Sequence, residues 1–349
     1  TTTSTGNNKT VSDSWADGNT NTGTCQLTYS GATGTRTFGV GAGGVHLNIT
    51  AGTDLLNLTG AVCKNLNFTG FTGTISAGTA TTVYGSLTMV SGMTVTSFSV
   101  STFAATTSET ITMAGKSFDG AVVFSGVGGT WTLQDAFTTT GSIKMASGTL
   151  VTGGFAVSAT LFGLNAGTKT LTLSTTVLTL TTTNTTVWDA ATNGTNFTLT
   201  AFTGTIKFTG TANTTVTFAG NGKTYGNVWF ARGTSTGGNT ITGTNTFADL
   251  QDNGTGAHTD TFPNVTTTVT TFTISNTSNK TTLIRTGGAG TWTISQASGT
   301  VCRDYLSISN STATGGASWY AGANSTAGGG NTGATFTASG RVPATTRTE

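Results

Sequence analysis

The five residues Phe71-Thr72-Gly73-Thr74-Ile75 occur a second time, unchanged, as Phe202 to Ile206. Each copy is followed by a Tyr-Gly pair, which begins at Tyr84 after the first copy and at Tyr225 after the second. From the phenylalanine to the tyrosine the chain runs from position 71 to 84 in the first copy and from position 202 to 225 in the second. The chain therefore contains internal repeats, and the second of these two copies is ten residues longer than the first.

A second repeat shows the same difference in length. Gly129-Thr130-Trp131-Thr132-Leu133 resembles Gly290 to Ile294, and both lead to the sequence Ala-Ser-Gly-Thr, which begins at Ala146 and at Ala297. From the tryptophan to this sequence the chain runs from position 131 to 146 in one case and from position 292 to 297 in the other. This difference of ten residues corresponds to about one strand and one turn. We therefore expect the chain to gain or lose whole strand–turn units, which a stacked repeat tolerates better than a closed barrel does.

Within the repeated units, apolar residues alternate with threonine. Leu171-Thr172-Leu173 and Val177-Leu178-Thr179-Leu180 are two examples. Successive side chains of a strand point to opposite faces, so this pattern predicts an apolar interior and a threonine-rich outer face. Glycine-rich joints such as Gly126–Gly129 supply the positive φ angles that tight turns need. The chain has only two prolines, so few backbone donors are missing from the predicted ladders.

These patterns predict an all-β protein and no amphipathic helix. Several short strands per turn, glycine corners and whole-unit insertions favour a right-handed parallel β-helix, that is, a β-solenoid with degenerate repeats. At roughly 20–30 residues per turn, the span of comparable repeats, the chain would form about a dozen turns. Tandem β-sandwich domains are the alternative, because regularly spaced short strands are also typical of them.

The composition is poor in charge. The 349 residues include 14 Lys and Arg and 12 Asp and Glu, whereas 51 are Gly and about a quarter are Thr. An ordinary soluble domain is roughly 25% charged, so helix bundles and most enzymes are disfavoured. The net charge is +2 and the basic residues are scattered singly, which gives no footprint for nucleic acid. No apolar run approaches the roughly 18 residues of a membrane span, so we expect none.

The sequence predicts three segments. Residues 1–24 are polar and are expected to form an N-terminal cap or attachment arm. Residues 25–309 carry the repeats and are assigned to the β-solenoid. Residues 310–349 are rich in Gly, Ser and Thr around Trp319-Tyr320, and we expect a C-terminal cap and tail there, because a terminal repeat must cover the exposed end of the core.

The three cysteines, Cys25, Cys63 and Cys302, are too few and too far apart for a disulfide framework. No C-x-x-C pair is present, which disfavours a zinc site. Free cysteine packs as a small hydrophobic residue, so we expect three buried thiols.

One local group of polar residues could carry chemistry. Asp249, Asp252 and Asn253 are followed closely by His258 and Asp260. They could form a glycan-cleaving or calcium-binding loop, because carboxylates serve both functions. They could instead form Asx turns at solvent-exposed corners. The spacing is neither that of an EF-hand nor that of a repeat-type calcium site, and we favour the exposed turns.

The other candidate residues have structural explanations. His46 lies between apolar residues and is expected to face outward from a strand; Gly41 to Gly44 precede no helix and are interpreted as a turn. Four aromatic residues could form a platform for sugar rings or could pack in the core, and we favour the core: Trp188, Trp229, Trp319 and Tyr320. We therefore assign no catalytic, cofactor-binding or metal-ligating residue, and we expect neither an enzyme nor a cofactor.

Two segments near the C-terminus carry a resemblance to known proteins. Trp292 to Ile308, with its Ala-Ser-Gly-Thr-Val-Cys-Arg-Asp-Tyr sequence, and Ser311 to Gly322 resemble the C-terminal turns of Thr/Gly-rich β-helix-like surface proteins. Such proteins occur in tailed phages, prophages and environmental bacteria. Lys223 to Val228 is similar to the same group, and the resemblance covers roughly residues 120–335. It implies a structural role at a virion or cell surface, and it supplies no catalytic residue.

The function expected from these observations is that of an extracellular structural protein, most of all a phage virion surface component such as a fibre, spike or decoration protein. A bacterial or archaeal cell-surface adhesin or filament subunit is the alternative. A protein that binds or cleaves polysaccharide is the third, with Asp249, Asp252 and Asp260 as its acids. We expect a homo-oligomer, either a trimer or a filament, whose partners are other virion or cell-surface proteins and surface glycans.

Overall fold

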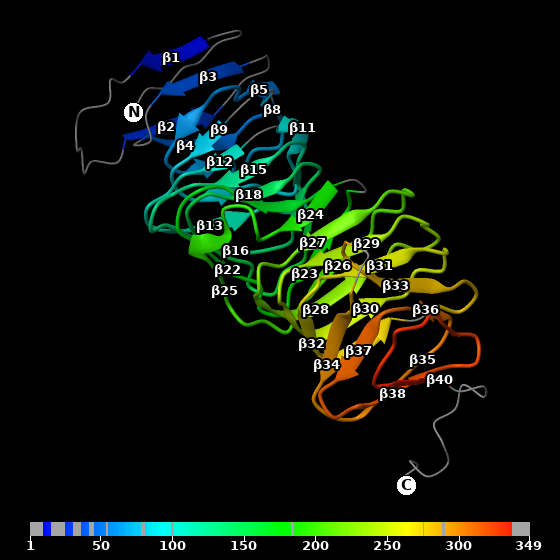
Figure 1. Cartoon of the computed structure of the whole chain (residues 1–349). Coiled ribbons are helices and arrows are strands. Elements are labelled where there is room, and N and C mark those ends of the chain that lie inside the picture. The colour runs from blue at the N-terminus through cyan, green and yellow to red at the C-terminus, as the bar shows by residue number, and fades with distance from the viewer. Residues whose placement is uncertain are drawn as a thin grey trace. The chain divides into compact units, whose positions relative to one another are not determined.

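The computed structural model describes residues 10–14, 25–30, 36–41, 45–53, 55–77, 81–98, 101–182, 185–274, 276–287 and 290–336. The chain is all-β, and its parallel strands are stacked as a β-solenoid of about 13 turns (Figure 1). This confirms the predicted parallel architecture and the predicted number of turns. The alternative, a row of tandem β-sandwich domains, is not observed in the described residues. Within the described ranges, helix is limited to one 3-10 turn at Gly194–Asn196.

The chain divides into two compact units. Unit 1 comprises Thr1–Thr176 and Thr195–Thr200, and unit 2 comprises Val177–Gly194 and Ala201–Glu349.

The strands of unit 1 belong to four sheets. Sheet I consists of β2 (Cys25–Ser30), β4 (Val45–Ala51), β7 (Leu66–Asn67), β10 (Leu87–Thr88), β13 (Ser108–Thr112), β16 (Thr130–Leu133), β19 (Gly148–Val151), β22 (Lys169–Thr172) and β25 (Phe197–Leu199). Sheet II consists of β1 (Thr10–Ser14), β3 (Arg36–Gly41), β5 (Leu55–Asn57), β8 (Thr74–Ala77) and β11 (Thr94–Phe98). Sheet III contains β6 (Val62–Cys63), β9 (Thr81–Val83), β12 (Ser101–Phe103), β15 (Val122–Phe124), β18 (Ile143–Met145) and β21 (Phe162–Leu164). Sheet IV contains β14 (Ser117–Phe118), β17 (Phe137–Thr139) and β20 (Val157–Ala159).

Each turn of unit 1 from β4 onward contributes three strands. The chain passes through sheet I, then sheet II or sheet IV, then sheet III, before it returns to sheet I. In sheet I, Thr130 pairs with Thr149, Thr149 with Thr170, and Thr170 with Thr198, so each pairing advances the chain by one turn. The lengths of these turns agree with the predicted span of roughly 20–30 residues.

The strands of unit 2 belong to three sheets. Sheet V contains β23 (Val177–Leu180), β26 (Thr205–Phe208), β28 (Thr224–Phe230), β30 (Thr246–Asp252), β32 (Thr266–Ile274), β34 (Trp292–Gln296) and β37 (Ser311–Thr314). Sheet VI contains β24 (Thr185–Asp189), β27 (Val216–Ala219), β29 (Asn239–Thr242), β31 (Thr259–Phe262), β33 (Thr281–Arg285), β36 (Leu306–Ile308) and β39 (Thr326–Ala327). Sheet VII consists of β35 (Thr300–Arg303), β38 (Ser318–Ala321) and β40 (Ala334–Phe336).

The turns from β26 to β33 contain two strands instead of three. The chain alternates there between sheet V and sheet VI, and the sheet V strands are longer than most strands of unit 1. Strands β28 and β30 have seven residues each and β32 has nine. A third strand per turn returns with β35. Turns of this solenoid therefore do gain and lose strands, as the repeats predict.

The core is aromatic, as expected from the alternating pattern. In unit 1, Trp131 is fully buried and its ring centroid lies 5.3 Å from that of Phe124. In unit 2, the indole N–H of Trp188 donates to the hydroxyl oxygen of Tyr225 at 3.1 Å, and that hydroxyl donates to the carbonyl of Gly220 at 2.6 Å. Both polar atoms of this buried pair therefore have partners, which avoids the cost of an unsatisfied group.

The repeated tryptophan motif occupies different sheets in its two copies. Trp131 lies in β16 of sheet I, whereas Trp292 lies in β34 of sheet V. After Trp131 the chain passes through β17 and β18 before it reaches the Ala-Ser-Gly-Thr sequence, whereas after Trp292 it reaches that sequence directly. The ten extra residues are therefore two very short strands and their corners, and the interpretation as one strand and one turn is wrong here.

The glycine of the Ala-Ser-Gly-Thr sequence is required by the backbone. Gly148 has a φ of 83° and Gly299 a φ of 91°, which is the left-handed region that other residues avoid. A Cβ atom on Gly148 would lie 2.4 Å from the carbonyl oxygen of Gly126, in the preceding turn.

We expect Gly148→Ala to lower the free energy of unfolding by at least about 2 kcal/mol, because it combines a left-handed backbone with a clash against a main-chain carbonyl. Gly128→Ala is the matched control, because Gly128 also has a positive φ of 75° but no atom lies within 4 Å of the position that its new methyl group would take. Chemical denaturation of both variants separates the two costs. Equal destabilisation by the two substitutions would contradict the role of the close approach.

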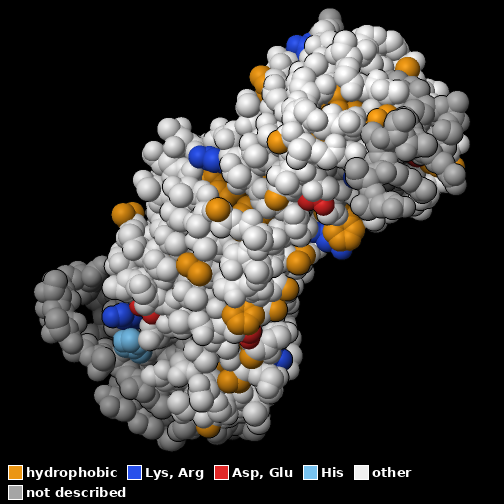
Figure 2. All heavy atoms as spheres, turned by 90° about the horizontal axis from the view of Figure 1, so that it is seen from below, with side chains coloured by type: hydrophobic (Ala, Val, Ile, Leu, Met, Phe, Trp, Pro, Cys, Tyr) orange, Lys and Arg blue, Asp and Glu red, His pale blue; other side chains and the backbone are white. Residues whose placement is uncertain are grey.

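The surface carries few charges and only scattered apolar side chains, as Figure 2 shows for one face.

Cys63 is buried, as predicted, and burial raises the pKa of its thiol to about 12. Cys302 is half-buried, and the prediction of full burial is wrong for it, because it follows the inward-facing Val301 in β35. The side chain of Cys25 lies outside the described residues.

Strands from both predicted terminal segments, residues 1–24 and 310–349, take part in parallel pairing. Of residues 1–24 the structure describes 10–14, which form β1 and pair with β3. Within residues 310–349, β37 pairs with β34, and β38 pairs with both β35 and β40.

Candidate functional site

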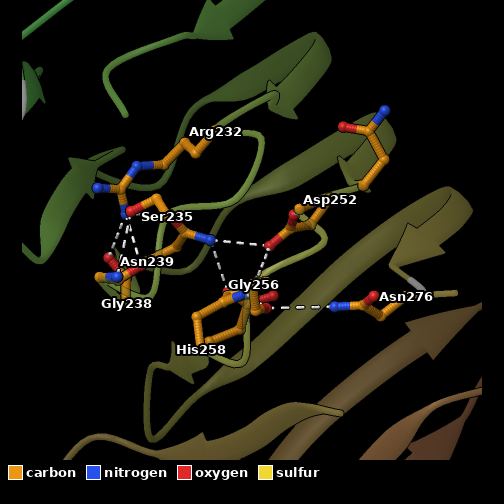
Figure 3. Close-up of polar contacts among 12 residues, drawn as sticks. Arg232, Ser235, Gly238, Asn239, Asp252, Gly256, His258 and Asn276 are labelled. Atoms are coloured by element: carbon orange, nitrogen blue, oxygen red, sulfur yellow. Dashed lines mark hydrogen bonds and ion pairs between the residues drawn. The ribbon is translucent and has the colours of Figure 1, made fainter. Parts of the chain in front are cut away.

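Five polar side chains meet inside unit 2, where the turns have two strands (Figure 3). Arg232 lies in the loop that follows β28, Asn239 begins β29, Asp252 ends β30, His258 precedes β31 and Asp260 lies within β31. Each of the five is at most 6% exposed. We call these residues the buried polar cluster.

Strand alternation places two of the carboxylates inside. In β31, Asp260 has the same facing as the buried Phe262, and in β30, Asp252 has the same facing as the buried Leu250. Asn239 of β29 is the register partner of Asp260, so the amide and the carboxylate stack on neighbouring turns. The cluster is thus formed by polar residues at positions that an apolar side chain would normally occupy.

Arg232 is held by main-chain carbonyls. Its Nε donates to Gly210 at 3.0 Å, and its Nη2 donates to Ala212 at 2.9 Å and Thr214 at 2.7 Å. Its Nη1 donates to Gly237 at 2.7 Å and Gly238 at 3.0 Å, and also to the side-chain oxygen of Asn239 at 3.2 Å. The guanidinium therefore ties the loop after β28 to the loop after β26, with every nitrogen satisfied.

Asn239 links the arginine to the two carboxylates. Because its Oδ1 accepts from Arg232, its Nδ2 points the other way and donates to Asp252 Oδ2 at 2.8 Å and Asp260 Oδ1 at 2.7 Å. Asp252 Oδ1 accepts from the backbone N–H of Gly254 at 2.7 Å. Asp260 Oδ2 is buried and has no hydrogen-bond partner.

His258 shares a proton with Asp252. Its Nδ1 lies 2.8 Å from the carbonyl oxygen of Gly256, which can only accept, so Nδ1 carries a hydrogen. Its Nε2 lies 2.6 Å from Asp252 Oδ2, and two such atoms approach this closely only with a proton between them. The same Nε2 lies 3.7 Å from Asp260 Oδ1.

Burial and the charge of Asp252 act in opposite directions on the pKa of His258 and in the same direction on the pKa of Asp260. Burial disfavours a charged imidazole, but the hydrogen bond to Asp252 and the negative charges of Asp260 and Asp252 outweigh it and raise the pKa of His258 to about 9. Burial, reinforced by the charge of Asp252, raises the pKa of Asp260 well above its usual range. The cluster therefore retains protons at neutral pH.

The cluster contains atoms that could bind a metal ion. His258 Nε2 and one oxygen each of Asp252 and Asp260 lie within 4.8 Å of one another, and such a set suits a divalent transition metal. The amide of Asn239, however, places its two N–H groups between the carboxylates, and Arg232 fixes that orientation. A donor amide and a neighbouring guanidinium both disfavour a cation, so the residues do not fit a resident metal.

Of the five polar residues that lie close together in the sequence, the structure brings only three into one cluster. Asp252, His258 and Asp260 are brought together, but they are buried, so the prediction of exposed turns is wrong for them. Asp249 lies on the other face of β30, where Thr273 donates to it at 3.1 Å. Asn253 is exposed and accepts from the indole N–H of Trp229 at 2.9 Å.

Nothing in the sequence singles out Arg232 or Asn239. At Asn239 a single polar residue begins a short strand, and this pattern is too common to predict a buried site. No local pattern marks Arg232, since its carbonyl partners at Gly210, Ala212 and Thr214 come from the preceding turn.

The four candidate aromatic residues do not form a platform. Trp188 and Trp319 are buried, in agreement with the prediction. Trp229 and Tyr320 are half-buried between inward-facing neighbours, so the prediction of core packing is wrong for these two. The ammonium group of Lys207 lies 4.1 Å from the ring centroid of Trp229.

His46 is half-buried and the next residue of β4, Leu47, is buried, in agreement with an outward orientation of His46. Burial, and then the charge of Lys64, lower the pKa of His46. Residues 42–44 of the predicted glycine turn lie outside the described residues.

Within the described residues, no helix has the length and apolar character needed to cross a membrane. No protein-family model, curated protein or solved structure matches this chain.

Proposed function

We propose that this chain is an extracellular structural protein that acts as a component of a phage virion surface, in a fibre, a spike or a decoration layer. The observation that carries the proposal is where the ionisable groups lie. The ionisable side chains of the buried polar cluster are at most 6% exposed, and Arg232 among them ties one turn of the solenoid to the next. They are placed to hold the fold together and not to meet a substrate, so we propose that the protein is not an enzyme.

The material properties of the fold support the same role. Parallel ladders join each turn to the next in several sheets, so most strand N–H and C=O groups are bonded within the stack. The outer positions carry mainly hydroxyl groups, which titrate only far from neutral pH. A surface of this kind changes little with salt or pH, and its few lysines and arginines offer few cleavage sites to trypsin-like proteases.

A cell-surface adhesin or filament subunit is the second candidate, and one observation favours it. Within the described residues, β40 pairs with β38 on one side and has no partner strand on the other. An open edge is a template for a strand of another copy, which would extend the stack. Assembly into a trimer or a filament is part of both proposals.

Immunogold labelling of native particles and cells with an antibody against this chain tests the proposal. We expect label on capsids or tails viewed by negative-stain electron microscopy. Label along cells or on free filaments would replace the virion proposal with the second candidate. Label confined to the cell interior would contradict both, and pre-absorbed antibody is the control.

A further inference from the structure

One outer face of unit 1 carries a two-dimensional array of threonines. Strands β13, β16, β19 and β22 each present two outward residues, separated by one residue that faces the core or lies partly covered; β25 presents one such residue, and a second follows the end of the strand. The first row consists of Ser108, Thr130, Thr149, Thr170 and Thr198, and the second row consists of Thr110, Thr132, Val151, Thr172 and Thr200. We call these ten residues the threonine array.

The array is regular in both directions. The pairing from β13 to β25 contains no register shift, so each residue of a row lies beside the next one. The second row continues past the end of β25, where the hydroxyl groups of Thr172 and Thr200 are 3.1 Å apart. Neighbours within a row are about 4.8 Å apart, and the two rows are about 6.6 Å apart, because these are the spacings of a sheet and of alternate residues in a strand.

The chemistry of the array is uniform. Eight of its ten positions are threonine, and Val151 has the same shape as threonine and keeps a methyl group at the same place. The lysine of β22, Lys169, is buried and donates to the carbonyls of Asn165 and Gly167 at 2.7 and 2.9 Å. Glu109 of β13 is half-buried and accepts from Ser86 and Thr107. The array itself is therefore an uncharged lattice of hydroxyl and methyl groups.

These features identify the kind of partner. An oligosaccharide is bound by outward aromatic rings, and the array has none, since Trp131 faces inward. A nucleic acid needs cations, which the array lacks. A protein interface has an apolar or aromatic centre, which rows of hydroxyl groups do not provide.

A crystalline partner with a short periodic repeat fits better. The hydroxyl groups can each join a hydrogen-bonded layer of water, while the methyl groups between them keep that layer from dispersing into bulk solvent. The spacing along each row is close to the repeat between equivalent oxygens in the plane of hexagonal ice. The rigid ladder beneath the array fixes the spacing in advance, so ordering costs on binding are small. We propose that the threonine array binds the surface of ice, independently of the virion or cell-surface role.

The test uses the full chain and ice itself as the probe. Fluorescently labelled protein is allowed to adsorb to a growing single crystal of ice, and thermal hysteresis and crystal shape are recorded in parallel. We expect adsorption, a hysteresis gap and faceted crystals. A crystal that takes up no fluorescence and shows no hysteresis gap would overturn the proposal.

A pair of variants locates the binding face. Thr149→Lys with Thr170→Lys places two ammonium groups at the centre of the array, and binding should fall at least about tenfold because they must lose their hydration. The matched control is Thr240→Lys with Thr261→Lys, at paired half-buried positions of β29 and β31 in unit 2, and it should bind within about twofold of the parent chain. Circular dichroism and thermal unfolding confirm that both variants are folded. Equal loss in both variants, or full adsorption by the array variant, would show that another surface contacts the ice and would overturn the assignment.

Discussion

Arg232→Met is expected to lower the free energy of unfolding by about 3–5 kcal/mol, which is the usual cost of removing one member of a buried charged network. The substitution leaves the carbonyl oxygens that accept from Arg232 without their donor, and it removes a cation whose charge interacts with Asp252 and Asp260. Methionine is apolar and fills part of the volume, so the lost hydrogen bonds and not a large cavity dominate the cost.

Two further variants make this measurement specific. Lys144→Met, at an outward position of β18, removes a cation from the surface and should change stability by less than about 0.5 kcal/mol. Arg232→Lys keeps the charge but loses the planar fork, so it should recover only part of the stability. Chemical denaturation at neutral pH, followed by tryptophan fluorescence, measures all three. If Arg232→Met and Lys144→Met had equal midpoints, the guanidinium would not be holding the loops together.

The second large effect is a loss of stability in mildly alkaline solution. The folded state raises the pKa of His258 from 6.5 to about 9, so it binds this proton more tightly than the unfolded chain does. The resulting stabilisation is fully present below about pH 6.5 and is lost as the pH rises through about 9. It amounts to about 3 kcal/mol, since one pKa unit corresponds to about 1.4 kcal/mol. Asp260 acts in the same direction, because its pKa is also raised by folding.

Unfolding midpoints between pH 6.5 and pH 9.5 measure this effect below the range in which most lysines and tyrosines titrate. His258→Gln is the comparison, because an amide can still donate to Asp252 but does not titrate. The parent chain should lose stability over this range, and the variant should show a much flatter profile. Parallel profiles for the two proteins would show that His258 does not hold the proton.

The sequence predicted the architecture because the signals for it are local. Alternating Leu and Thr, as in 171–173, defines an inner and an outer face, and glycine corners define the turns. The sequence did not predict that two of its acids would be buried, although the signal was present. Asp260 is two residues from Phe262 and Asp252 is two residues from Leu250, so the alternation already places both carboxylates inside. A charged side chain is more often found at an exposed corner than in a core, and that general preference points the other way.

The remaining part of the cluster could not be predicted, because it depends on contacts between turns. The partners of Arg232 are main-chain carbonyls at Gly210, Ala212 and Thr214, and any residue type can supply a carbonyl. The exact lateral register of the turns decides which of them face the guanidinium. That register follows from the lengths of the loops between strands, and the repeats are too degenerate to fix those lengths.

The two-strand turns of unit 2 have a mechanical consequence. A turn that is attached to its neighbours through three ladders resists bending in every direction, whereas attachment through two ladders leaves one soft direction. The loops after β26 and β28 lie on the side without a ladder, and Arg232 joins them, with further ties from Ser235 to Ala212 and from Thr236 to Asn213. The buried polar cluster therefore acts as a strut, which stiffens the solenoid where its cross-section would otherwise be most compliant.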